Sequence, residues 1–173
     1  MRLTVYTDYT LRVMMYLAMT WPTGRVATID EIAGAYDISR NHLTKIVHEL
    51  GLNGFIVTTR GRAGGAALAR PPNEISIGDI VRMAEKDFAV VACHDTAVPH
   101  GCQIFPACNL KRGLARAVDA FMAELDAMTL QDAITVPTVA ASLLGMGVQA
   151  RPVRVMRSRP PAAKKAPRSA RSS

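Results

Sequence analysis

The chain has 173 residues, a formal net charge of +7, a hydrophobic content of 49% and only three cysteines. This size suits one compact domain, or one domain with an appendage. No stretch reaches the roughly 18 apolar residues that a membrane span needs. The N-terminus also lacks the apolar run of a secretory signal, so we expect a cytoplasmic protein without a membrane partner.

The positive charge is concentrated at the C-terminal end. Residues 145–173 hold eight Lys and Arg and no Asp or Glu, which leaves 13 basic and 14 acidic residues in 1–144. Within that body, 1–72 hold eight basic and five acidic residues, whereas 73–144 hold five and nine. The basic excess in the N-terminal third predicts a nucleic-acid surface there.

A first helix is expected from Asp8, a residue type that caps helix N-termini, up to a stop at Pro22 and Gly24. The spacing of its apolar residues places one stripe inward. That stripe consists of Leu11, Met14, Met15, Ala18 and Met19.

Two shorter helices follow, with the pattern of a helix-turn-helix. Thr28 and Glu31 form a capping box for the first, which should end near Tyr36. Ser39 should cap the second, and Gly51 stands where a glycine ends a helix. The expected inward residues are Ile32, Ala33, Leu43, Ile46, Val47 and Leu50.

A hairpin is expected directly after this pair, because the β-prone runs FIVTT and AALA flank the sequence RGRAGG. A hairpin in this position is the wing of a winged helix, and it completes a DNA-binding domain over 1–72. Gly61, Gly64 and Gly65 permit the positive φ angles of a tight tip. Arg60 and Arg62 on that tip suit contacts with the minor groove or the phosphate backbone.

The second helix of the pair should be the reading helix, whose N-terminal end enters the major groove. Arg can pair with guanine and Asn with adenine, while Lys and His suit phosphates. The alternative is an ordinary polar helix face. The candidate DNA-contacting residues are Ser39, Arg40, Asn41, His42, Lys45 and His48.

The remaining chain divides into four parts. A linking helix capped by Ser76 lies within 73–86, and a cysteine loop spans 87–108. A long helix begins near Asn109, and a short terminal helix begins at Thr129, within 109–136. The apolar seam of the long helix repeats over about 28 Å, which exceeds what a small winged domain can cover, so we expect it to form a homodimer. The last part, 137–173, is expected to be a basic, disordered tail.

The cysteines Cys93, Cys102 and Cys108 are separated by eight and five residues. An odd number within one loop argues against a disulfide framework, and the absence of a C-x₂₋₄-C pair argues against a zinc knuckle. Thiolates at wide gaps suit an iron–sulfur cluster. Three thiols leave one coordination position, for which His94, His100 or a carboxylate is a candidate.

These segments together resemble a known family, the winged-helix iron–sulfur transcription regulators. The resemblance rests on TDYTLR at 7–12, SRNHLTKIVHELG at 39–51, RGRAGG at 60–65 and the run from the cysteines into ACNLKRGLARAV. It covers residues 1 to about 135, and it is strongest to the nitric-oxide-sensing NsrR branch. The iron-responsive and cluster-assembly branches, RirA and IscR, are more distant.

The resemblance implies a homodimeric repressor that binds a palindromic operator in double-stranded DNA and releases it when nitric oxide modifies the cluster. It implies that Cys93, Cys102 and Cys108 hold a 4Fe–4S or 2Fe–2S cluster, with Asp8 of the partner subunit as the fourth ligand. No histidine follows Cys108, unlike in the cluster-assembly branch. The gap before Cys102 is longer than the resemblance leads one to expect.

Three other functions can be compared with this one. A sibling regulator that senses iron or redox state would share the fold and the ligands. A non-specific DNA binder would act through the basic tail alone. An enzyme is not expected, because the chain has no G-x-G-x-x-G after a strand, no P-loop and no Ser-His-Asp arrangement.

Overall fold

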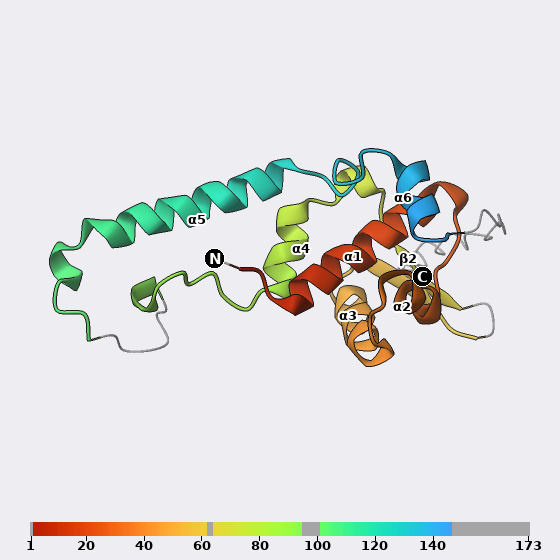
Figure 1. The fold of residues 1–173 in the computed structure, drawn as a ribbon, viewed down its shortest axis with the longest axis horizontal. Coiled ribbons are helices and arrows are strands. Elements are labelled where there is room, and N and C mark those ends of the chain that lie inside the picture. Colours follow the sequence, from red (N-terminus) through yellow and green to blue (C-terminus); the bar gives the residue numbers. More distant parts are fainter. Residues whose placement is uncertain (1, 62–63, 95–100, 147–173) are drawn as a thin grey trace, which may run out of the picture.

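The computed structural model describes residues 2–61, 64–94 and 101–146. It is mainly helical, with one small antiparallel sheet (Figure 1), which confirms the expected fold class. The helices and strands are α1 (Val5–Thr20), α2 (Ile29–Tyr36), α3 (Arg40–Leu52), β1 (Ile56–Thr59), β2 (Gly65–Leu68), α4 (Ile77–Ala84), α5 (Asn109–Ala127) and α6 (Pro137–Leu143). Single turns of 3-10 helix occupy Trp21–Thr23, Pro72–Glu74, Ala92–His94 and Phe105–Ala107.

Helix α1 is the centre of the molecule, in contact with α2, α3, α4, β2 and α6 (Figure 1). Its N-cap is Thr4, whose hydroxyl accepts a hydrogen bond from the Thr7 N–H, so the expectation that Asp8 caps this helix is wrong. Asp8 instead lies in the first turn, where the positive end of the helix dipole favours a carboxylate.

Helices α2 and α3 form the expected helix-turn-helix pair. Both hydrogen bonds of the Thr28–Glu31 capping box are present, and the Ser39 hydroxyl accepts from the His42 N–H. Asp37 turns the chain between the helices in the left-handed region, with φ of 53°. The expected inward residues are buried except Ala33, which is half-buried.

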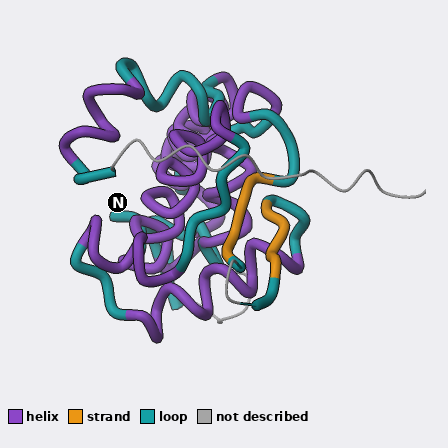
Figure 2. Tube along the Cα trace, turned by 90° about the vertical axis from the view of Figure 1, so that its right-hand side faces the viewer, coloured by secondary structure: helices purple, strands orange, loops and turns teal. Residues whose placement is uncertain are grey.

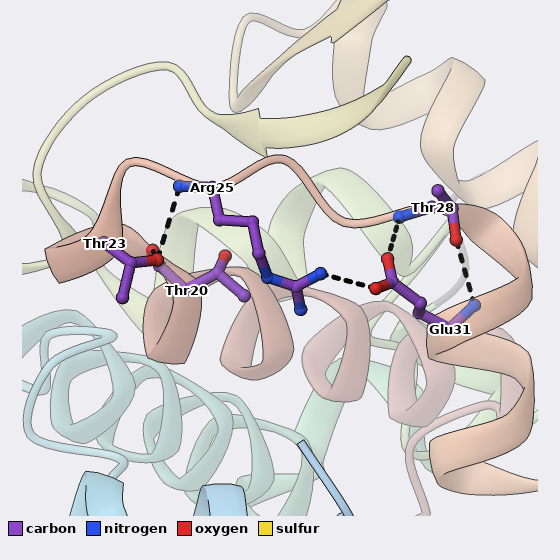
Figure 3. A network of polar contacts seen from close by, with 5 residues as sticks. All are labelled: Thr20, Thr23, Arg25, Thr28 and Glu31. Atoms are coloured by element: carbon purple, nitrogen blue, oxygen red, sulfur yellow. Dashed lines mark hydrogen bonds and ion pairs between the residues drawn. The ribbon is translucent and has the colours of Figure 1, made fainter. Parts of the chain in front are cut away.

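A network of polar contacts fixes the connection between α1 and α2 (Figure 3). The Thr23 hydroxyl donates to the Thr20 carbonyl and accepts from the Arg25 N–H, and the Arg25 guanidinium pairs with Glu31. Burial acts to raise the pKa of Glu31, but hydrogen bonds from Thr28 and Arg25 outweigh it and hold that pKa below its usual value. The carboxylate therefore stays charged and keeps α2 in place.

The wing pairs β1 with β2 in antiparallel register, from Ile56 opposite Leu68 to Thr59 opposite Gly65, at one side of the helices (Figure 2). On its other side, β2 pairs with a single residue before α2, because Ala27 and Ala66 exchange two hydrogen bonds of 2.8 Å. Of the three glycines expected to need a positive φ, only Gly61 has one, at 104°. Gly65 is required for a different reason, because a Cβ there would lie 2.6 Å from the Ala27 carbonyl oxygen.

Helix α5 is attached to the body at its C-terminal half and projects away from it at its N-terminal half (Figure 1). The Ile77 N–H donates to the Met128 carbonyl at 2.9 Å, and Arg82 of α4 forms two hydrogen bonds with Asp126. Only Met122 of its 19 residues is buried. The end of the helix that begins at Asn109 therefore lies at the outer end of an arm.

Two expectations for the C-terminal third are wrong. Thr129 and Asp132 form the hydrogen bonds of a cap, but only a single turn follows, closed by the bond from the Ala133 N–H to the Thr129 carbonyl. The expected tail contains helix α6, which begins with Pro137 and packs against α1. Residues 147–173 lie outside the described residues.

Replacing Gly65 by Ala is expected to destabilise the domain by about 1–3 kcal/mol, because the added methyl group would push the Ala27 backbone away from the wing. Gly51→Ala is the matched control, since its Cβ would meet no atom within 4 Å inside helix α3. This control should be stabilising by about 0.5–1 kcal/mol. Urea unfolding of the metal-free protein measures both, and equal stabilities for the two variants would contradict the packing described.

Candidate functional site

Helix α3 presents one polar face to solvent. Leu43, Ile46, Val47 and Leu50 are buried on the other side. Every residue predicted to contact DNA from this helix or its cap is exposed, and so is Thr44, which the sequence analysis missed although it lies four residues after Arg40. The exposed set is Ser39, Arg40, Asn41, His42, Thr44, Lys45 and His48.

The N-terminal end of α3 has one partner on α2. Arg40 forms an ion pair of 2.8 Å with Asp30, and the two side chains are 69% and 62% exposed. An ion pair this exposed contributes only about 0–1 kcal/mol, so the guanidinium can exchange Asp30 for another acceptor. The Thr44 hydroxyl donates to the Arg40 carbonyl at 2.8 Å, which keeps Thr44 close to the helix axis.

The other end of this face borders an open cavity of about 900 Å³. Lys45, His48 and Glu49 form one wall, residues 2–4 and Tyr6 at the start of α1 form a second, and residues 83–90 form the third. The Tyr6 hydroxyl is buried here with no hydrogen-bond partner among the described residues. Burial, and then the charge of Glu49, raise the pKa of Tyr6, so this phenol stays neutral.

The wing residues are only partly described. Arg60 is exposed directly after β1, at the start of the hairpin tip. Arg62 lies outside the described residues.

The cysteine segment lies at the arm formed by α5. Cys93 is half-buried within the turn Ala92–His94, Cys102 is exposed, and Cys108 is half-buried directly before α5. All three are free thiols. Cys108 is the N-cap residue of α5, and the first turn contains no acidic residue, so the positive end of the helix dipole favours a negative charge on Cys108.

Lys111 connects the pieces of this segment. The His94 ring donates from Nε2 to the Lys111 carbonyl at 2.9 Å. The Lys111 ammonium donates to the Phe105 carbonyl at 3.0 Å and lies 3.4 Å from the centre of the Phe105 ring. The sequence analysis missed Lys111, because only the fold shows that it reaches both turns.

The candidates for a fourth ligand differ in availability. His94 uses Nε2 for the Lys111 carbonyl, which leaves only Nδ1. His100 lies outside the described residues. Asp8 is half exposed and pairs with Arg12 at 2.9 Å, and Arg12 in turn lies 5.8 Å from the centre of the Tyr36 ring at the end of α2. Asp8 is therefore accessible, and it is linked to the helix-turn-helix pair.

The chemistry of this donor set fits an iron–sulfur cluster, because three free thiols come from one segment and a carboxylate is accessible. Within residues 2–61, 64–94 and 101–146, no three side chains of His, Cys, Asp and Glu gather in metal-binding geometry. A metal site on these three thiols would therefore require them to come together on binding, or with a second subunit.

Comparison with known proteins identifies the family. The sequence model named Rrf2, described as an iron-dependent transcriptional regulator, matches residues 3–135. The chain belongs to the Rrf2 family. It is 46% identical over 134 residues to the HTH-type transcriptional regulator NsrR of Bacillus subtilis, covering 78% of this chain and 90% of that protein.

Solved structures of the Rrf2 fold agree. CymR of Staphylococcus aureus matches with a TM-score of 0.61 at 29% identity, over 77% of this chain and 98% of that one. The structure of IscR from T. potens matches with a TM-score of 0.60, over 78% of this chain and 86% of that one. At 24% identity this match supports the fold alone.

The comparisons confirm the resemblance to the NsrR branch and show that the relatives of this chain are transcriptional regulators rather than enzymes. Across the described part of the chain, the structure contains no helix that is both long and apolar enough to cross a lipid bilayer.

Proposed function

We propose that this chain is a DNA-binding transcriptional repressor whose grip on its operator depends on an iron–sulfur cluster and ends when nitric oxide reaches that cluster. Its membership of the Rrf2 family and its identity with NsrR support the DNA-binding regulator. The main support for a cluster is the set of three free thiols on one segment. Residues 83–90, which precede this segment, line the same cavity as Lys45, His48 and Glu49 of the reading helix.

Cys93, Cys102 and Cys108 would hold the cluster, and Asp8 of the partner subunit would fill the remaining position. Asp8 is exposed on the first turn of α1. No group of three donors that includes it forms within one protomer's described residues, which favours a site shared between subunits. Nδ1 of His94 is the competing donor.

A homodimer is supported by the exposed apolar seam of α5. Near the C-terminal end of the helix, Phe121 and Leu125 of this seam pack against the core of the same chain. Near its N-terminal end, Leu110 is 69% exposed and therefore lacks a covering partner within the described residues. An amphipathic helix needs a partner for its apolar face. A second copy of α5 would supply it and would set the spacing of two reading helices on a palindromic operator.

Two routes connect the cysteine segment to the reading helix. The first runs through Glu85, whose carboxylate accepts from the Thr4 N–H at 2.6 Å and lies in the cavity bordered by Lys45 and His48. The second runs through Asp8. If its carboxylate binds iron, it gives up the ion pair with Arg12, and Arg12 lies over the ring of Tyr36 at the end of α2. Both routes end at the helix-turn-helix pair.

When bound, an iron–sulfur cluster supplies iron sites that react with nitric oxide. Release by the thiols would free residues 87–108 and return Asp8 to Arg12, so that the reading helices lose their common register. A full switch from 99:1 to 1:99 requires about 5.5 kcal/mol of differential binding. In this mechanism the loss of the metal–ligand bonds in each dimer would have to supply that difference.

The first test is operator footprinting under anaerobic conditions. Protein purified without oxygen is expected to absorb broadly in the visible range and to protect a palindromic site, and both properties should disappear on titration with nitric oxide. A Cys102→Ser variant should lack both from the start. If metal-free protein protects the operator as tightly as the coloured form, cluster control is wrong.

The alternative is a sibling regulator that senses iron supply or redox state, since the family is described as iron-dependent. Parallel titrations with nitric oxide, oxygen and an iron chelator rank the signals. Release at stoichiometric nitric oxide, before the other two act, supports the proposal, and earlier release by chelator supports the alternative.

The role of Asp8 can be tested by Asp8→Ala. Loss of a ligand is expected to speed cluster loss to a chelator by roughly tenfold or more. Asp30→Ala is the matched control, because Asp30 is also an exposed first-turn carboxylate paired with an arginine, and its cluster should persist as in the unaltered protein. Equal retention in the Asp8 variant would rule out this ligand.

The basic tail and the reading helix can be separated by ending the chain after Met146, since Leu144 and Met146 pack against the core. The shortened protein should keep its preference for operator over scrambled duplex and show a weaker salt dependence. In it, Asn41→Ala should lose roughly tenfold of that preference, whereas Asn73→Ala, an exposed change away from α3, should not. A shortened chain without preference would show that the tail drives binding.

A further inference from the structure

Lys111 is the residue at which the separate turns of the cysteine segment meet. It lies in the first turn of α5, three residues after Cys108. Its ammonium donates to the Phe105 carbonyl, and its own carbonyl accepts from the His94 ring. One residue therefore contacts the turn that carries Cys93 and the turn between the other two cysteines.

The Phe105 carbonyl is the centre of the second turn. The Phe105 N–H donates to the Cys102 carbonyl at 3.1 Å, and the Cys108 N–H donates to the Phe105 carbonyl at 3.4 Å. Lys111 adds a second donor to that same oxygen. A bond from a charged donor is shorter and stronger than one between neutral groups, so the 3.0 Å bond from Lys111 is stronger than the 3.4 Å bond from the Cys108 N–H.

The aromatic ring adds to this contact. The Lys111 ammonium lies 3.4 Å from the centre of the Phe105 ring, within the range of a cation–π interaction. Both residues are half-buried, which reduces screening by solvent. The backbone from Cys102 to Cys108 is thereby held against α5.

We propose that Lys111 is a positioning residue that orders the Cys102–Cys108 turn on α5 and so lowers the entropy that the thiols lose when they bind metal. This role rests on the proposed function as far as the cluster is concerned. The order that Lys111 imposes on the turn belongs to the chain itself, and it is testable in metal-free protein.

The variants follow from the geometry. Lys111→Met keeps the length of the side chain but removes its charge and donor, and Lys111→Arg keeps both. The His94 contact uses the Lys111 backbone, so neither change removes it. Arg112→Met is the matched control, because Arg112 is the next residue on the same helix and is exposed, with no hydrogen bond or ion pair in the described structure.

The first experiment is hydrogen exchange of the metal-free protein. Lys111→Met is expected to speed exchange in peptides covering 102–108 by roughly fivefold to tenfold, with Lys111→Arg close to the unaltered protein. Peptides of 89–94 and of α1 should keep their rates. Unchanged exchange at 102–108, or a similar rise in α1, overturns the proposal, since the second result would give Lys111 a role in the whole fold.

The second experiment measures how long each anaerobically loaded variant keeps its visible absorption in an iron chelator. Lys111→Met should lose it several times faster than the Arg112→Met control, with Lys111→Arg restored. If Lys111→Met speeds hydrogen exchange at 102–108 but does not speed the loss of visible absorption, the positioning role is overturned. If the unaltered protein takes up no iron, the proposed function fails, and the exchange result still decides whether Lys111 orders the turn.

Discussion

The structure depends on a helix that its own protomer cannot cover. Helix α5 has 19 residues, and only Met122 among them is buried. Its C-terminal half is held by the Arg82–Asp126 pair and by backbone bonds to α4, while its N-terminal half carries the cysteine segment outward. The helix that would bury its apolar residues in the proposed dimer therefore also places the thiols where a second copy could reach them.

Helix α1 makes the arm relevant to DNA recognition. Its last turns are buried against the wing and α6, whereas at its start Asp8 is exposed and the N-cap Thr4 donates to Glu85, in the segment that leads to Cys93. Through Arg12 and Tyr36 it also touches the end of α2. A rigid helix that contacts both regions can transmit a displacement of one to the other, since packed interiors shift as units rather than deform.

Much of this fold could be predicted because its signals are local. The caps at Thr28, Ser39 and Ser76 depend on side chains within three residues of the bonds they make. The inward stripe expected for α1 is correct for Met14 and Ala18, which are buried, and incomplete because Thr10 is also buried, with its hydroxyl donating to the Tyr6 carbonyl. The spacing of apolar residues cannot reveal a buried polar side chain whose hydroxyl is hydrogen-bonded to the backbone of its own helix.

The candidate site was harder to predict, because the sequence gives the types of the possible ligands but not the distances between them. Three cysteines in one loop identify thiolate chemistry, but the described residues leave them ungathered. Lys111 has no signature beyond its distance from Cys108. Its importance comes from the 3-10 turn at Phe105–Ala107, which directs a carbonyl at the first turn of α5. A single basic residue can then hold a turn against the helix that follows it.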